Sequence, residues 1–355
     1  RKLKSFWKNK KVFITGHTGF KGSWLTIFLH LLGAKVYGYS LKQEKYSLYN
    51  FAKIEKIVTK SIIGDIRDYN KLKKSIKKSH PDFLFHMAAQ PLVRYSYDFP
   101  KYTYEANTFG TLNILNILKE IKFLKSAIII TTDKVYKNIN SKKYFKESDE
   151  LGGHDPYSSS KACAELITQS YNDSILSKFN ISCVTVRAGN VIGGGDFAPN
   201  RIIPDFFRAF NNKKTLNLRY PNAIRPWQHV IEPLYGYILL LMIISKSKKP
   251  ISGSWNFGPK KSNNVKVKKI ISILNANLKN KIQVKEKFIK KNSYKESNVL
   301  RLNSNKSKKT LKWRPIYNIH QTLNLISEWQ NNFLKDRKNI LPICQKQIIN
   351  YINQF

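Results

Sequence analysis

A tyrosine and a lysine four residues apart are the side chains in this sequence whose types and spacing first suggest chemistry. The run Asp155-Pro156-Tyr157 is typical of a helix start, because proline lacks the N–H that would be unpaired in the first turn. Lys161 then lies one turn beyond Tyr157 on the same face. A neighbouring ammonium lowers the pKa of a phenol. The pair therefore predicts a proton acceptor for a hydroxyl group, with a surface tyrosine beside a helix lysine as the alternative.

A second chemical signal follows the predicted strand at residues 127–131. Thr132, Asp133 and Lys134 come directly after it, and ligands of doubly wound sheets bind at the carboxyl ends of strands. Thr132 can bond a substrate hydroxyl beside Tyr157, and Asp133 can act as a general acid. A loop-capping Thr-Asp turn is the alternative.

A glycine-rich turn near the N-terminus predicts a dinucleotide site. The strand-like residues 11–15 lead directly into Gly16-x-x-Gly19-x-x-Gly22, and an apolar helical segment follows at 23–32. Such glycines permit a tight turn and let backbone amides approach a pyrophosphate. An ordinary glycine-rich turn is disfavoured by the strand and helix that flank it.

The second predicted strand, at residues 35–39, leaves the choice of dinucleotide open. An acidic residue is expected near its end to hold the ribose hydroxyls of NAD, but Ser40 and Lys42 stand there instead. Ser40 can bond the ribose, whereas Lys42 equally suits the 2′-phosphate of NADP.

The remaining elements that position these residues follow at the spacing of βα units. Strand-like runs at 62–66, 82–86 and 184–187 alternate with helical segments. The alternation predicts an α/β protein with a doubly wound parallel sheet of the Rossmann type and a smaller C-terminal substrate domain. We expect the dinucleotide-binding domain at 1–188, joined by 225–255, the smaller domain at 189–224 and 256–340, and a tail at 341–355.

Composition narrows the class of protein. The chain of 355 residues has 63 Lys and Arg against 22 Asp and Glu, a net charge of +41. These lysines are spread through every segment without zinc-finger or basic-zipper spacing, so we expect no nucleic-acid partner. Cys163, Cys183 and Cys344 follow no disulfide or metal pattern, which predicts a cytoplasmic protein without a metal site. The longest apolar run, 235–244, is too short to cross a bilayer, so no membrane partner is expected.

Taken together, the motifs resemble those of the extended short-chain dehydrogenase/reductases that act on nucleotide sugars. The resemblance covers nearly the whole chain and extends to Glu296 and residues 300–315. The longest shared stretches are similar to those of CDP-glucose 4,6-dehydratases: 16–24, 88–94, 152–157, 188–196 and 225–230. In the related dTDP-glucose enzymes a glutamate stands at the position of Lys134.

The resemblance implies an NAD-dependent lyase that converts CDP-glucose to CDP-4-dehydro-6-deoxyglucose and water. Tyr157 would accept the proton of the C4 hydroxyl, and Asp133 would protonate the departing C6 hydroxyl. Lys134 is a hypothetical base for the C5 hydrogen; a role in orienting Asp133 or polarising the ketone is an equal alternative.

The resemblance also implies three sets of site residues. The catalytic set is Thr132, Asp133, Lys134, Tyr157 and Lys161. The cofactor set is Gly16, Thr18, Gly19, Phe20, Gly22, Ser40, Asp65, Ile66, Ala88, Ala89, Gln90 and Asn107, together with Tyr157 and Lys161. The substrate set is Arg94, Asn190, Arg201, Arg225, Gln228 and His229. Arg201 and Arg225 are the diphosphate candidates, although either can instead be a surface ion-pair residue.

Other functions remain open from the sequence. A nucleotide-sugar 4-epimerase, or a dehydratase of another nucleoside diphosphate sugar, needs the same oxidation by Tyr157, but an epimerase has no leaving group for Asp133 to protonate. A non-catalytic NAD(P)-sensing or nucleic-acid-binding protein is the alternative of a different class, motivated by the charge of +41. We expect a homodimer or a homotetramer, and the residues do not choose between them.

Overall fold

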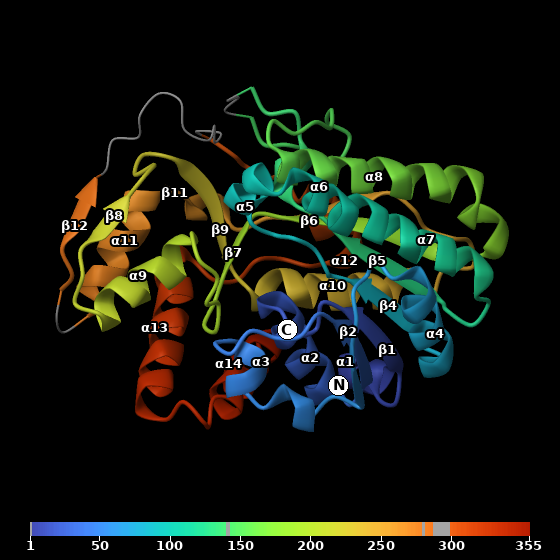
Figure 1. Cartoon of the computed structure of the whole chain (residues 1–355), viewed down its shortest axis with the longest axis horizontal. Helices are drawn as coiled ribbons and strands as arrows, with labels where there is room; N and C mark the ends of the chain where they lie inside the picture. Colours follow the sequence, from blue (N-terminus) through green and yellow to red (C-terminus); the bar gives the residue numbers. More distant parts are fainter. Residues whose placement is uncertain (1, 140–142, 279–280, 287–298) are drawn as a thin grey trace.

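Seven parallel strands form the central sheet, as the computed structural model shows (Figure 1). The structure describes residues 2–139, 143–278, 281–286 and 299–355, so Glu296 lies outside the described residues. The strand order is β10-β6-β5-β4-β1-β2-β3. The strands are β1 (Lys11–Thr15), β2 (Lys35–Ser40), β3 (Lys60–Ile63), β4 (Phe83–His86), β5 (Ser126–Ile130), β6 (Ser182–Ala188) and β10 (Ser254–Phe257). This is the doubly wound sheet predicted from the alternating runs.

Helices cover both faces of this sheet because successive side chains of a buried strand point in opposite directions. Val12 and Ile14 of β1 belong to the core beneath one set of helices, and Phe13 belongs to the core on the opposite face. The first face carries α1 (Lys2–Trp7), α2 (Phe20–Leu31), α10 (Ile231–Ile244) and α14 (Leu341–Ile352). The second carries α4 (Tyr69–Ser79), α7 (Gly110–Glu120) and α8 (Pro156–Ser174).

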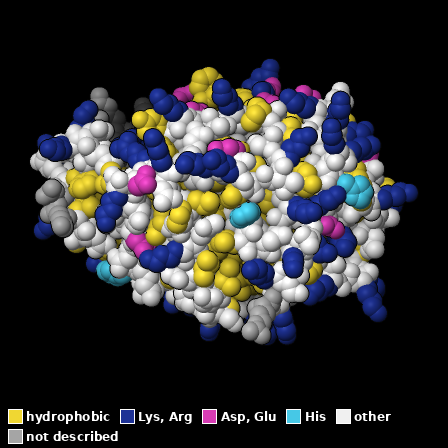
Figure 2. Space-filling view, turned by 90° about the horizontal axis from the view of Figure 1, so that it is seen from below, with side chains coloured by type: hydrophobic (Ala, Val, Ile, Leu, Met, Phe, Trp, Pro, Cys, Tyr) yellow, Lys and Arg dark blue, Asp and Glu magenta, His cyan; other side chains and the backbone are white. Residues whose placement is uncertain are grey.

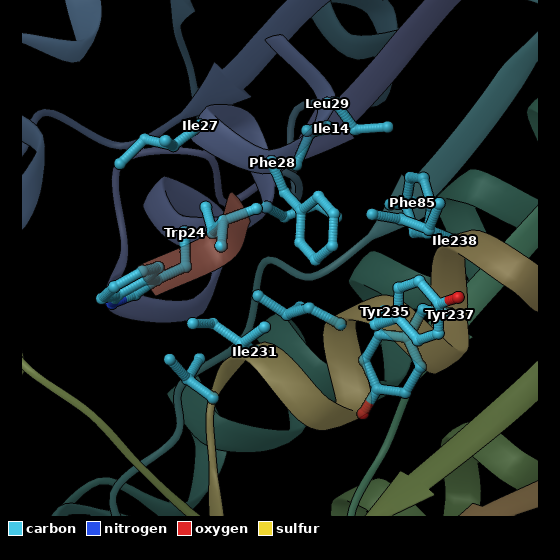
Figure 3. Close-up of a cluster of buried hydrophobic side chains, with 14 of the residues drawn as sticks. Ile14, Trp24, Ile27, Phe28, Leu29, Phe85, Ile231, Tyr235, Tyr237 and Ile238 are labelled. Carbon is cyan, nitrogen blue, oxygen red and sulfur yellow. The ribbon is translucent and has the colours of Figure 1, made fainter. Parts of the chain in front are cut away.

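The first core is held by aromatic and branched side chains of α2 and α10 (Figure 3). Phe28 and Tyr235 stack with their ring centroids 6.2 Å apart. Because α2 begins at the glycine loop, this packing fixes the helix start that the dinucleotide motif requires. The remaining short helices around the sheet are α3 (Leu48–Phe51), α5 (Val93–Asp98), α6 (Pro100–Tyr104) and α12 (Asn305–Leu311), with a π-helical turn at Glu105–Phe109 and 3₁₀ turns at Ile54–Lys56, Asp133–Val135, Leu176–Phe179 and Lys261–Asn263.

A smaller unit lies beside the carboxyl ends of the sheet strands, at the left of Figure 1. Its strands form a three-stranded sheet in the order β11-β9-β7 and a parallel pair of β12 with β8. Its own core gathers Phe206, Trp227, Ile270 and Leu323. The elements are β7 (Asn190–Ile192), β8 (Leu216–Leu218), β9 (Ile224–His229), β11 (Asn264–Lys266), β12 (Val284–Glu286), α9 (Ile202–Asn211), α11 (Val267–Ala276) and α13 (Ile319–Lys335).

The structure corrects three details of the prediction. The strand expected at 62–66 is β3 at Lys60–Ile63, and the helix expected from residue 23 begins at Phe20. The tail that the sequence left without an interpretation forms α14, which packs against α2. Its Cys344 accepts a hydrogen bond from the Trp329 indole at 3.3 Å, so the end of the chain is part of the core.

Basic side chains are spread singly over the molecular face in Figure 2, with acidic groups between them. This pattern agrees with the scattered lysines of the sequence. The apolar run 235–244 is the buried part of α10. Among the described residues, no helix combines the length and the apolar character needed to cross a membrane.

Candidate active site

The helix that carries Tyr157 is fixed at its start by Asp155. Its carboxylate accepts hydrogen bonds from the Ser158 N–H at 2.9 Å and from the Ser158 hydroxyl at 2.6 Å. The Tyr157 N–H, which has no partner within α8, donates to the Ser96 hydroxyl at 3.1 Å. These bonds satisfy the free amides of the first turn and hold Tyr157 at the predicted second position of the helix.

Tyr157 opens into a cavity of about 370 Å³ between the sheet and the smaller unit. The cavity brings together nine of the predicted catalytic and substrate residues: Arg94, Thr132, Asp133, Lys134, Tyr157, Lys161, Asn190, Arg201 and Arg225. Phe20 and Ala89 of the cofactor set also line it. It is large enough to hold a small polar ligand.

The predicted lowering of the Tyr157 pKa is not found in the structure. Burial raises the pKa of Tyr157 to about 12, although the Thr132 side chain and the charge of Arg201 favour the phenolate. Lys161 donates instead to the Ile130 carbonyl at 3.0 Å, and burial lowers its own pKa to about 8. Tyr157 is therefore protonated in the ligand-free cavity, because desolvation outweighs the cations around it.

Asp133 is the acidic group of the cavity. It is 3% exposed, and burial raises its pKa to about 6 against the opposing effects of Lys134, Thr132 and Arg225. Its Oδ1 accepts from the Thr132 hydroxyl at 3.1 Å, whereas its buried Oδ2 has no hydrogen-bond partner. A carboxyl group of this kind can hold a proton near neutral pH and give it to a ligand.

The glycine loop fits a dinucleotide because its backbone is packed too closely for side chains. Gly16 has φ +77°, and a Cβ there would lie 2.7 Å from the Ala88 nitrogen; a Cβ at Gly22 would lie 2.1 Å from the Gly16 oxygen. The loop thus lies directly against Ala88 of the turn after β4. Gly19 caps α2 without a side-chain hydrogen bond, and a helix start of this kind can bind a pyrophosphate through its backbone amides.

Other predicted cofactor residues support this cradle through side-chain contacts. The hydroxyls of Thr18 and Ser40 lie 2.7 Å apart, joining the glycine loop to the end of β2. The Asn107 amide accepts from the Gln90 N–H at 2.8 Å and donates to the Ser160 hydroxyl at 2.9 Å. It thereby ties the turn after β4 to α8.

The adenine-side candidates lie farther along the same edge of the sheet. Asp65 forms an ion pair with Arg67 at 2.8 Å. Ile66 is buried against Gly110, the first residue of α7. Asp65 remains 27% exposed at its side chain, so it is accessible to a ligand.

Arginines of the smaller unit, together with Arg94 of α5, close the opposite side of the cavity. Arg201 pairs with Asp196 at 2.9 Å. Arg94 and Arg219 both donate to the Asn200 side chain, at 3.2 and 3.5 Å. Arg225 is buried and donates to the Ile224 carbonyl at 3.0 Å. This concentration of guanidinium groups suits the oxygens of a diphosphate.

Two predicted substrate residues do not line the cavity. Gln228 donates to the Phe257 carbonyl at 2.8 Å and is fully buried. His229 lies in the core between the rings of Trp24 and Tyr317, where burial lowers its pKa to about 3. Gln228 points away from the cavity because it alternates along β9 with Trp227, which lines the cavity. His229, the last residue of β9, is instead held in the core by its two ring contacts.

The structure adds cavity residues that the sequence reasoning missed, namely Lys21, Asp196 and Arg219. Asp196 and Arg219 belong to polar segments without a regular repeat, so their spacing does not predict which side chains face the cavity. Lys21 stands inside the glycine motif, which is the signal that would have identified it.

Comparisons with known proteins agree with this geometry. The family described as GDP-mannose 4,6 dehydratase matches residues 13–326. The CDP-glucose 4,6-dehydratase of Salmonella typhimurium is 39% identical over 99% of this chain and 98% of its own. The CDP-paratose 2-epimerase of Salmonella typhi is 29% identical over 53% of this chain and 59% of its own.

Solved structures share the fold. An epimerase from Methanothermobacter thermautotrophicus superposes with a TM-score of 0.80 at 22% identity, covering 95% of this chain and 96% of its own. The dTDP-glucose 4,6-dehydratase of Bacillus anthracis, in complex with NAD, has a TM-score of 0.73 at 23% identity, covering 91% and 97%. The chain therefore belongs to the GDP-mannose 4,6 dehydratase family of extended short-chain dehydrogenase/reductases, within which its full-length similarity is to a CDP-glucose 4,6-dehydratase.

Proposed function

We propose that this chain is an NAD-dependent CDP-glucose 4,6-dehydratase, a lyase that forms CDP-4-dehydro-6-deoxyglucose and water. The observation that carries the proposal is the 39% identity with the Salmonella enzyme over 99% of the chain. The Asp133 carboxyl group supports a dehydratase over an epimerase, since its unpartnered Oδ2 and raised pKa suit an acid for a leaving hydroxyl.

NAD would be held by the glycine loop, Ser40, Asp65 and the turn at Ala88–Gln90. Close backbone contacts shape the glycine loop, and the loop leads directly into the first turn of α2. When bound, oxidised NAD supplies the hydride acceptor for C4, returns the hydride at C6 and adds a positive charge to the cavity. The dTDP-glucose 4,6-dehydratase of Bacillus anthracis, which shares the fold, was crystallised in complex with NAD.

Tyr157 would accept the C4 hydroxyl proton as that carbon is oxidised. The Thr132 side chain and the charge of Arg201 both lower the pKa of Tyr157 and so favour the phenolate that this step requires. Lys161 provides a further ammonium from the next turn of α8. The resulting 4-ketone acidifies the hydrogen on C5.

Elimination follows when a base removes the C5 proton and the C6–O bond breaks. The electron pair of the C5–H bond forms the C5–C6 double bond, and Asp133 would protonate the departing hydroxyl to give water. The base would return its proton to C5 when a hydride is added at C6. Lys134 lines the cavity beside Asp133, so it is the proposed C5 base. Its positive charge would alternatively orient Asp133.

Incubation with a panel of CDP-, dTDP-, UDP- and GDP-sugars tests the function. We expect CDP-glucose alone to give a 4-keto product that absorbs in alkali. Formation of a hexose epimer would favour the 4-epimerase alternative. Dehydration of a different nucleotide sugar would show that the substrate is that sugar and not CDP-glucose. Absence of turnover with the whole panel, while NAD still binds, would favour a non-catalytic NAD-sensing protein.

We also propose that the protein is cytoplasmic, that it forms a homodimer or homotetramer, and that its two domains divide at the predicted boundaries, with the 341–355 tail packed on the dinucleotide-binding domain through α14. The three free cysteines support a reducing compartment. Phe109 and Leu166, which are 57% and 54% exposed near α7 and on α8, supply apolar surface for a second copy. Light scattering of the purified chain tests the oligomeric state: a monomer at micromolar concentration would contradict it.

A further inference from the structure

Lys21 is a charged residue of the cavity that the reaction described above does not use. It is the second residue of α2, and its side chain is half-buried where it lines the cavity with Asp133 and Tyr157. Its ammonium lies 5.4 Å from the centroid of the Tyr237 ring on α10. Within the described part of the chain it makes no hydrogen bond and no ion pair.

The charges that face Lys21 are mostly of its own sign. Lys161 of α8 and Arg201 before α9 repel it, and Asp133 after β5 is the carboxylate that attracts it. Tyr237, on the remaining side, offers a ring face and a buried hydroxyl that has no hydrogen-bond partner. Arg201 is already paired with Asp196. The cavity therefore contains more positive charge than its carboxylates neutralise.

We propose that Lys21 is a phosphate-binding side chain whose protonation is coupled to ligand binding. Its ammonium would bond an oxygen of a diphosphate group held in the cavity. That chemistry is shared by the dinucleotide and by the nucleotide sugar, so either can be the source. The inference rests on the proposed function only in treating this cavity as the nucleotide site.

The coupling follows from the environment of the amino group. Burial, together with repulsion by Lys161 and Arg201, lowers the pKa of Lys21 to about 7. A bound phosphate raises that pKa again, because an opposite charge favours the ammonium. Binding then takes up close to one proton at pH 8, where free Lys21 is mostly neutral, and almost none at pH 6. Affinity for the anion should accordingly fall as the pH rises above about 7.

Isothermal titration calorimetry of the full chain tests this coupling directly. CDP and NAD are titrated separately at pH 6 and pH 8, each in two buffers of different ionisation enthalpy, which gives the protons taken up. The ligand that shows uptake at pH 8 is the one whose phosphate contacts Lys21. Asp133 titrates near pH 6 and Lys161 near pH 8, but both remain in every variant, so the difference in proton uptake between wild type and variant isolates Lys21.

Lys21→Met removes the ammonium with little change in side-chain length. We expect it to abolish the proton uptake and to weaken binding of that ligand about ten- to a hundredfold, as for loss of a charge-assisted contact. Lys21→Arg should keep the affinity within about threefold but lose the uptake, since a guanidinium stays charged at pH 8. Lys35→Met, at an exposed position of β2, is the matched control and should behave as wild type.

The outcomes separate this inference from the proposed function. If proton uptake and ligand affinity are unchanged in Lys21→Met, the proposed role of Lys21 is wrong, while the nucleotide site remains supported. Failure of the wild-type chain to bind either CDP or NAD would overturn the proposed function itself. Melting temperatures of all three variants show whether a loss of binding reflects unfolding.

Discussion

The two sides of the active-site cavity are built on different principles. On the sheet side, Thr132, Asp133, Tyr157 and Lys161 come from the end of β5 and from α8, and all are fixed by regular elements. On the other side, Arg94, Arg201 and Arg219 extend from helices and loops and are held by Asn200 and Asp196.

A buried ion pair makes the sheet side rigid. Glu165 of α8 accepts two parallel hydrogen bonds from Arg187 of β6, both 2.9 Å, and both side chains are 3% exposed. Glu165 also accepts from Thr131, the neighbour of Thr132. The groups proposed to move protons are thus fixed by buried contacts, whereas the groups proposed to bind phosphate are held by a few polar side chains.

The largest effect should come from Tyr157→Phe, which removes the proton acceptor and preserves the ring. We expect kcat to fall about 10³- to 10⁴-fold, near the upper range for loss of general acid–base catalysis. NAD binding, followed by calorimetry, should be nearly unchanged. Turnover at the wild-type rate would show that the sheet side does not perform the oxidation.

Asp133→Asn should lower the rate of dehydration about 10²- to 10³-fold, because an amide cannot protonate the C6 hydroxyl. The expected signature is that C4 oxidation persists while elimination fails. Single-turnover measurement of absorbance at 340 nm would show the reduced cofactor accumulating. Equal loss of oxidation and elimination would mean that Asp133 positions Tyr157 rather than acting as the acid.

The rigidity of the sheet side can be tested through stability. Arg187→Met leaves Glu165 charged and buried without its partner, so we expect the free energy of unfolding to fall by about 3–5 kcal/mol. Urea denaturation followed by fluorescence measures the change. Lys214→Met, at an exposed position of the smaller unit, is the control and should change stability by less than about 0.5 kcal/mol. A change below about 1 kcal/mol in Arg187→Met would show that the ion pair is not structurally important.

On the side of the cavity that carries the arginines, Arg219→Met should raise the KM for CDP-glucose about tenfold with little change in kcat. The guanidinium lines the cavity and donates to the side chain and the carbonyl of Asn200, so its loss should remove a phosphate contact without moving the proposed catalytic groups. Steady-state kinetics separate the two constants. A fall in kcat at constant KM would place Arg219 in the chemistry instead.

The smallest predicted effect is a pH dependence. Burial raises the pKa of Asp133 to about 6, and the acid role requires its protonated form, which is lost as the pH rises through that value. Between pH 6 and 7, kcat/KM should therefore fall about fivefold, since kcat/KM reports groups of the free enzyme. The Asp133→Asn variant should show a flatter profile in this range. A wild-type profile that rises over the same interval would contradict a protonated Asp133.

Much of the fold and part of the site were determined by local sequence. Proline and aspartate at 155–156 predict the start of α8, and the glycine spacing at 16–22 predicts the turn before α2, because both patterns depend on backbone geometry within a few residues. Thr132 and Asp133 were predicted as site residues because ligands gather at the carboxyl ends of parallel strands, and the structure places both in one cavity with Tyr157.

Only the tertiary structure decided what those residues experience. Burial made the pKa of Tyr157 rise where the Lys161 spacing predicted a fall, and the register of β9 turned Gln228 and His229 into the core. Lys21 and Arg219 reach the cavity through contacts between segments distant in the chain. Sequence spacing determines which groups share a face, whereas desolvation and the approach of distant charges depend on how the faces pack together.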